Sequence, residues 1–181
     1  MSQHQSYIVF DLETQRRIDE VGGRSNFHQL GMSVAVLYDS ASDSTEVYRE
    51  EQANLLLDRL GSAPLIVGFN IIHFDFPVLS GYGALDFRTL PTVDLMQHIV
   101  ESAGFRLSLD NLVRTTLNAQ KSASGLQAIQ WFQDGNWQDL IDYCRNDVLL
   151  TRDLYMFGKE RGYVSYFDRK YRVERKIKVA W

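Results

Sequence analysis

The chain has 181 residues, of which 45% are hydrophobic, so one domain of ordinary size can bury its own core. A single cysteine, Cys144, excludes an internal disulfide framework, and no apolar run is long enough to cross a bilayer. The first residues, MSQHQSYIVF, lack the basic and apolar regions of a secretion signal. We therefore expect a cytoplasmic protein with no membrane partner.

The net charge of −4 is distributed unevenly along the sequence. From Lys159 to Trp181 there are eight basic and three acidic residues, a net charge of +5, so the first 158 residues carry −9. This division suits an enzyme that binds cations in an acidic body and a polyanion along a basic tail. A solvated surface strand explains the basic tail equally well.

Strand-like and helix-like segments alternate along the chain, as in an α/β domain. After Lys159, apolar residues partly alternate with charges, which predicts a two-stranded basic ribbon around Asp168–Lys170. We expect the body at 1–158 and the ribbon at 159–181 to belong to one domain. The expected elements before the ribbon are, in chain order, strands at Tyr7–Leu12, Leu30–Tyr38 and Ser44–Tyr48, a helix at Glu51–Leu60, a strand at Pro64–Asn70, a short helix at Phe74–Tyr82, a strand at Thr92–Asp94, and helices at Leu95–Ala103, Leu109–Leu117, Gly125–Phe132 and Asn136–Lys159.

Two acids stand close together at the end of the first expected strand. Asp11 and Glu13 are two residues apart, and in a strand such side chains point to the same side. Two carboxylates so close are costly unless a cation lies between them, which indicates a metal site. An exposed pair of acids at a strand end is the alternative.

Two later segments also contain acids in positions that suit a ligand site. Asp75 lies in GFNIIHFDFPVL, near the carboxyl end of a buried strand, where ligands bind in α/β sheets. Tyr143 and Asp147 lie four residues apart in YCRNDVLLT, on one face of the longest expected helix. Taken singly, Asp75 is also typical of a helix N-terminus, and Tyr143 with Asp147 is also typical of a surface pair.

Together the three motifs resemble those of the DEDD exonuclease superfamily, which has a ribonuclease H-like fold. FDLET is similar to the first exonuclease motif, and GFNIIHFDFPVL to the second as it occurs in proofreading domains of family B DNA polymerases. YCRNDVLLT is similar to the third motif in its tyrosine-containing form, called DEDDy. The resemblance covers roughly residues 7–155 and points to a stand-alone or helicase-associated relative. It implies a five-stranded mixed sheet with an antiparallel second strand and helices on both faces.

The resemblance implies a metal-dependent 3′→5′ exonuclease. In such an enzyme Asp11, Glu13, Asp75 and Asp147 would bind two Mg²⁺ or Mn²⁺ ions. Such hard cations prefer carboxylate oxygens, and the motifs contain no cluster of cysteine and histidine for zinc. Tyr143 would position the attacking water, because a phenol with its ordinary pKa of about 10 is a poor base.

The resemblance also places Thr14, Asn70 and Phe74 at the substrate. Phe74 would stack on an unpaired base, although packing in the core is an equal alternative. Lys121 follows a helix, and the resemblance would allow it to touch the scissile phosphate. We expect a solvated lysine instead. Asp94 ends a short strand and is expected to cap the next helix.

The expected reaction releases nucleoside 5′-monophosphates from a nucleic-acid 3′ end, with single-stranded DNA favoured over RNA. The expected partners are the nucleic acid itself and a helicase or another repair or replication protein. A non-catalytic nucleic-acid-binding or scaffolding module of the same fold is the main alternative, and a structure-specific endonuclease is a third. The motif residues would contact phosphate and sugar rather than bases, so the motifs do not decide between DNA and RNA as the substrate.

Overall fold

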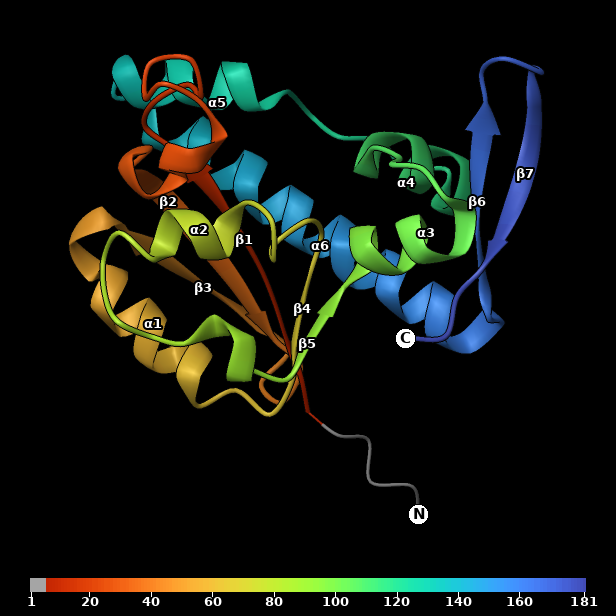
Figure 1. Ribbon diagram of the computed structural model, residues 1–181, viewed down its shortest axis with the longest axis horizontal. Coiled ribbons are helices and arrows are strands. Elements are labelled where there is room, and N and C mark those ends of the chain that lie inside the picture. Colours follow the sequence, from red (N-terminus) through yellow and green to blue (C-terminus); the bar gives the residue numbers. More distant parts are fainter. Residues whose placement is uncertain (1–5) are drawn as a thin grey trace.

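A mixed five-stranded sheet forms the centre of the fold in the computed structural model, which describes residues 6–181 (Figure 1). The first five residues of the segment in which we expect no secretion signal lie outside the described residues. The strands follow the order β3-β2-β1-β4-β5, and β1 (Ile8–Thr14) is the central one. It pairs antiparallel with β2 (Met32–Asp39) and parallel with β4 (Ile66–Gly68). The expected sheet, with its antiparallel second strand, is therefore confirmed.

All the helices and strands expected from the sequence are present, with ends that differ by a few residues. Three short 3₁₀ helices were not expected, because one or two turns are too short to produce a periodic pattern. The remaining elements are β3 (Ser44–Arg49), β5 (Thr92–Asp94), α1 (Ala53–Gly61), α2 (Asp75–Leu79), α3 (Leu95–Ala103), α4 (Leu109–Leu117), α5 (Gly125–Gln133), α6 (Trp137–Arg161), β6 (Tyr163–Asp168), β7 (Val173–Lys178) and the 3₁₀ helices η1 (Arg24–Gln29), η2 (Glu50–Gln52) and η3 (Phe87–Thr89).

The side chains of β1 alternate between two hydrophobic cores, one on each face of the sheet. The even-numbered residues from Ile8 to Leu12 pack with α1 and α2, whereas Val9 packs with α6. Because successive strand residues point to opposite faces, Asp11 and Glu13 share the face of Val9. The two acids therefore emerge toward α6, at the carboxyl end of the central strand.

Helix α6 runs along one face of the sheet and contributes a long buried stripe to the core (Figure 1). The helix ends at Arg161 and is capped by Gly162, whose left-handed φ of 72° lets the chain turn directly into β6. Within residues 6–181, no helix combines the length and the apolar character needed to span a membrane. The buried residues of the stripe are Leu140, Tyr143, Cys144, Asp147, Val148, Leu150, Thr151, Leu154, Tyr155 and Gly158.

The basic ribbon is formed by β6 and β7, which pair antiparallel. Its inner face buries Val164, Tyr166 and Ile177 in the same core as α6, so the ribbon is packed onto the body. The turn between the strands is longer than expected, because pairing stops at Asp168 and resumes at Val173.

Candidate active site

Three of the four expected acids form a tight group between β1 and α6. One carboxylate oxygen from each of Asp11, Glu13 and Asp147 lies within 4.8 Å of the others. Asp75 is the first residue of α2, and its Oδ1 accepts a hydrogen bond from the backbone N–H of Leu12 at 3.1 Å. This bond ties Asp75 to the strand that carries the other two acids, so all four converge, with Asp75 just outside the tight group.

Burial raises the pKa values of all four carboxyl groups, and repulsion from neighbouring acids adds to the effect. Burial, reinforced by the charge of Asp147, raises the pKa of Asp11 to about 7. Burial and then the charge of Asp11 raise the pKa of both Glu13 and Asp75 well above the ordinary range. Burial also raises the pKa of Asp147, although Lys121 opposes it. A bound cation would relieve the repulsion within such a group.

Lys121 is an ion-pair partner of this acidic group, so our expectation of a solvated lysine was wrong. Its Nζ lies 2.5 Å from Oδ2 of Asp147, and only 23% of its side chain is exposed. Burial lowers the pKa of Lys121, but the neighbouring Asp147 outweighs burial and leaves it raised. The ammonium therefore stays charged. Lys121 lies in the loop between α4 and α5. A loop has no periodic sequence pattern from which the direction of this side chain could be predicted.

Tyr143 and Asp147 share a buried face of α6, as their spacing predicts, and the alternative of a surface pair is wrong. Tyr143 is only 2% exposed, and its ring lies 5.2 Å from the Lys121 ammonium. Burial, followed by the charge of Glu13 and then of Asp147, raises the pKa of the Tyr143 phenol. The hydroxyl thus keeps its proton and can donate a hydrogen bond beside the acids.

The donor set fits a hard divalent cation. Within residues 6–181, Asp147 Oδ1 is one of three buried side-chain polar atoms without a hydrogen-bond partner, which marks a position where a ligand can complete the site. The nearest sulfur, in Cys144, donates to the backbone carbonyl of Asp11 at 3.4 Å. Burial raises the pKa of this thiol well above its usual value, so it remains protonated. Carboxylate oxygens are left as the ligands, which suits Mg²⁺ or Mn²⁺.

Two neighbouring pockets, one of them lined by Glu13, contain the three expected substrate residues. The Thr14 pocket, of about 480 Å³, is lined by Glu13, Thr14 and residues that begin α5. The Asn70 pocket, of about 540 Å³, lies on the other side of Phe74 and Ile18, which line both pockets. Phe74 is half-buried and makes an edge contact with the ring of Phe27. It therefore packs against the core and also forms a wall between two cavities.

The Asn70 pocket contains two arginines, Arg24 and Arg106, that the sequence did not single out. Arg106 Nη2 donates to Oδ1 of Asn70 at 2.6 Å. The backbone of Asn70 has a left-handed φ of 68°, and its N–H is bound by Asp94 at 2.8 Å. The pocket is thus held in shape by polar contacts that link the loop after β4 to the end of β5 and to the loop after α3.

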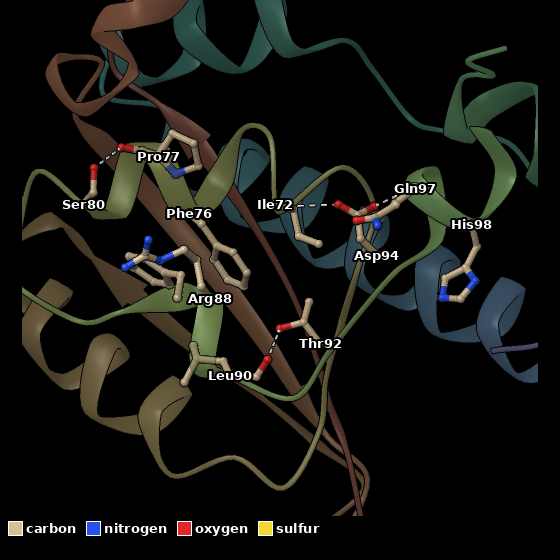
Figure 2. A pocket seen from close by; sticks show the side chains of 11 residues that line it. Ile72, Phe76, Pro77, Ser80, Arg88, Leu90, Thr92, Asp94, Gln97 and His98 are labelled. Carbon is tan, nitrogen blue, oxygen red and sulfur yellow. Dashed lines mark hydrogen bonds between the residues drawn. The ribbon is translucent and has the colours of Figure 1, made fainter. Parts of the chain in front are cut away.

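Asp94 caps α3, as expected, and also holds the loop that precedes Asp75. Its carboxylate accepts from the backbone N–H groups of Met96 and Gln97 at the start of α3, and from Ile72 at 3.0 Å (Figure 2). Asp94 lies at the edge of an apolar pocket of about 480 Å³ beside β5, shown in Figure 2, that none of the four acids lines. That pocket is separate from the acidic group.

A family model of the RNase H superfamily matches residues 8–157, which include the four acids and Tyr143. The chain belongs to the RNase H superfamily. Comparison with curated proteins found no match. An RNase H superfamily domain with this acidic group supports nuclease-type hydrolysis of a nucleic acid and the use of a divalent metal.

Proposed function

We propose that this RNase H superfamily protein is a two-metal-ion 3′→5′ exonuclease of the DEDDy type, which acts on single-stranded DNA in preference to RNA. The observation that carries the proposal is the convergence of four carboxyl groups, all with raised pKa values, at one end of the central strand. We assign the body at 1–158 and the ribbon to this one catalytic domain. A helicase or another repair or replication protein would supply its 3′ ends.

The metal ions would be held by Asp11, Glu13, Asp75 and Asp147. When bound, divalent ions lower the pKa of a water and neutralise charge on the phosphate and the leaving oxygen. The carboxylates supply the negative charge that retains these cations, and the buried setting strengthens that attraction. Protonated carboxyl groups would have to lose their protons as a cation binds, so binding should release protons.

Tyr143 and Lys121 would act on the water and on the phosphate. The raised pKa of Tyr143 keeps its hydroxyl protonated, so this group orients the attacking water by a hydrogen bond and does not take a proton from it. Lys121 places a fixed positive charge beside Asp147. Such a preorganised charge stabilises the negative charge that grows on the phosphoryl oxygens.

The shape of the neighbouring pockets supports action at a strand end. The Thr14 pocket adjoins Glu13 and is bounded by Phe74 and Ile18, a volume that suits one nucleotide better than a duplex. The partly exposed ring of Phe74 offers a face on which an unpaired base can stack. We therefore place the terminal nucleotide in the Thr14 pocket, and the nucleotide before it on the other side of Phe74.

The direct test is incubation of the purified chain with a 5′-labelled single-stranded oligonucleotide and Mg²⁺ or Mn²⁺. We expect a ladder of shortened products, which EDTA and Asp11→Asn both abolish. Asp58→Asn, an exposed acid on α1, serves as the matched control and should leave the ladder unchanged. The same assay on RNA and on duplex ends ranks the substrates.

Two outcomes would contradict the proposal. Absence of shortening with either metal, where a control exonuclease is active, would favour a non-catalytic nucleic-acid-binding module. Cleavage of a circular single strand would favour an endonuclease, because a circle has no 3′ end.

A further inference from the structure

The outer part of the ribbon is strongly basic, and little of this charge is neutralised. Between Arg169 and Lys178 there are six basic residues and one acid, Glu174. Within residues 6–181, the ion pairs include only one of these six, Arg175, which binds Asp168 at 2.9 Å. The other five cationic side chains therefore remain available to an external anion. They are Arg169, Lys170, Arg172, Lys176 and Lys178.

Exposed aromatic side chains accompany these charges. Tyr171 is 58% exposed, Phe167 is 42% exposed, and Phe105 beside the ribbon is 44% exposed. The ring of Tyr171 has the Lys170 ammonium 5.0 Å from its centre and the Arg175 guanidinium 5.1 Å away. Charges alone would suffice to protect an exposed edge strand from aggregation, but open aromatic rings would not help. Cations interleaved with open rings are typical of surfaces that bind single-stranded nucleic acid.

The ribbon has a fixed position on the body. The side chain of Asn111 in α4 accepts from the backbone N–H of Phe167 at 2.8 Å and donates to its carbonyl at 3.0 Å. Thr116, further along α4, forms the same two kinds of bond with the backbone of Ser165, each at 2.9 Å. These four bonds cover one edge of β6 and orient the outer face of the ribbon.

Adjacent residues of the chain line the Asn70 pocket and a second pocket at the ribbon. The Asn70 pocket reaches Arg106, and the next residue, Phe105, lines a further pocket of about 750 Å³ together with Lys176 and Lys178 of β7. Phe105 also makes an edge contact with Tyr166 of β6, with ring centres 5.7 Å apart. Figure 1 shows the ribbon beside α4, at the end of the molecule away from α1 and α5. A strand that runs from the Asn70 pocket toward the ribbon would pass Arg106 and then Phe105.

We propose that the ribbon is an auxiliary binding surface for single-stranded nucleic acid, which holds the strand on the 5′ side of the nucleotides in the active site. Its lysines and arginines contact phosphates, and Tyr171 and Phe167 stack on bases, so binding is independent of sequence. The direction of the strand rests on the proposed exonuclease function. The binding itself rests only on the charge, the exposed rings and the pocket beside β7.

The test is the affinity of the full-length chain for oligonucleotides of two lengths, measured by fluorescence anisotropy in EDTA so that no hydrolysis occurs. The variant Lys170→Gln/Arg172→Gln/Lys176→Gln should bind a strand of about twenty nucleotides roughly tenfold more weakly at low salt. Its plot of log affinity against log salt should be less steep by about two, because each lost contact with a single strand removes about 0.7. Affinity for a trinucleotide should change by less than about twofold, since so short a strand does not reach the ribbon.

Arg88→Gln is the matched control, because this side chain is 90% exposed and lies on η3, outside the ribbon and the acidic group. It should leave both affinities unchanged. Tyr171→Ala removes the ring and keeps every charge, and it should weaken binding of the long strand about fivefold without altering the salt dependence. Thermal unfolding of each variant checks that the fold is retained.

Unchanged affinity for the long strand in both ribbon variants would overturn the inference. The proposed exonuclease function is tested separately, by hydrolysis with the parent chain. If the parent chain shortens no substrate while the ribbon variants still lose affinity, the exonuclease proposal fails and the ribbon inference stands. If the parent shortens its substrate and the ribbon variants bind as tightly as the parent, the ribbon inference fails and the exonuclease proposal stands.

Discussion

Replacing Asp11 with asparagine is expected to abolish hydrolysis and, in the absence of metal, to stabilise the protein. Burial and the charge of Asp147 raise the pKa of Asp11 from 3.8 to about 7 in the folded chain. The ionised carboxylate therefore has a higher free energy in the folded protein than in water. Asparagine has nearly the same shape and no charge, so it removes this penalty while it also removes a ligand for the metal.

The sign and size of the effect follow from that pKa. The folded chain binds more protons than the unfolded chain between pH 3.8 and about 7, so the parent loses stability as the pH rises through this window. The rise of the Asp11 pKa from 3.8 to about 7, at about 1.4 kcal/mol for each tenfold change in proton affinity, gives an upper limit of about 4 kcal/mol. Redistribution of protons among the neighbouring acids makes the effect smaller than this limit. We expect the free energy of unfolding of Asp11→Asn to exceed that of the parent by about 2 kcal/mol at about pH 8. The difference should vanish below about pH 4.

The assay is urea unfolding of both proteins in EDTA, followed by circular dichroism at several pH values from about 4 to 8. Asp58→Asn, on the surface of α1, controls for the loss of one acid anywhere in the chain. Addition of Mg²⁺ or Mn²⁺ should stabilise the parent more than Asp11→Asn, because only the parent keeps all four proposed ligands. The reasoning is refuted if the variant is less stable than the parent at about pH 8 without metal, or if the difference does not depend on pH.

Three further substitutions test the other members of the site. Tyr143→Phe should lower kcat about tenfold to a hundredfold with KM within about twofold, because the ring remains and only the group that orients the water is lost; steady-state kinetics that show an unchanged kcat would remove Tyr143 from the chemistry. Lys121→Met should lower kcat/KM about a hundredfold. It should also lower the free energy of unfolding without metal by about 3 kcal/mol, because Asp147 loses its buried partner. A variant as stable as the parent would contradict the ion pair. Phe74→Ala should raise KM for an oligonucleotide about tenfold; an unchanged KM, with lower stability alone, would limit Phe74 to packing against Phe27.

Periodic patterns in the sequence were enough to predict the frame of the site. The alternation along β1 places Asp11 and Glu13 on one face, and the four-residue spacing of Tyr143 and Asp147 places both on one side of α6. Because a buried strand and a buried helix must pack their apolar faces together, the polar residues that share those faces are brought together as well.

Short and irregular segments resisted prediction. The 3₁₀ helices η1, η2 and η3 consist of one or two turns, which leave no pattern in the sequence. The wall that Phe74 forms between two pockets depends on Ile18, from a loop far away in the chain. Packing between segments distant in sequence decides such features.

The sequence by itself determined the fold class, the central strand, the long helix and the acids that they carry, because backbone periodicity and burial act locally along each element. Only the tertiary structure decided that Lys121 pairs with Asp147 and that Arg106 reaches Asn70. Both cations come from loops, where no repeating pattern fixes the direction of a side chain. The charge balance of the site and the shape of the Asn70 pocket therefore depend on how distant loops meet in space.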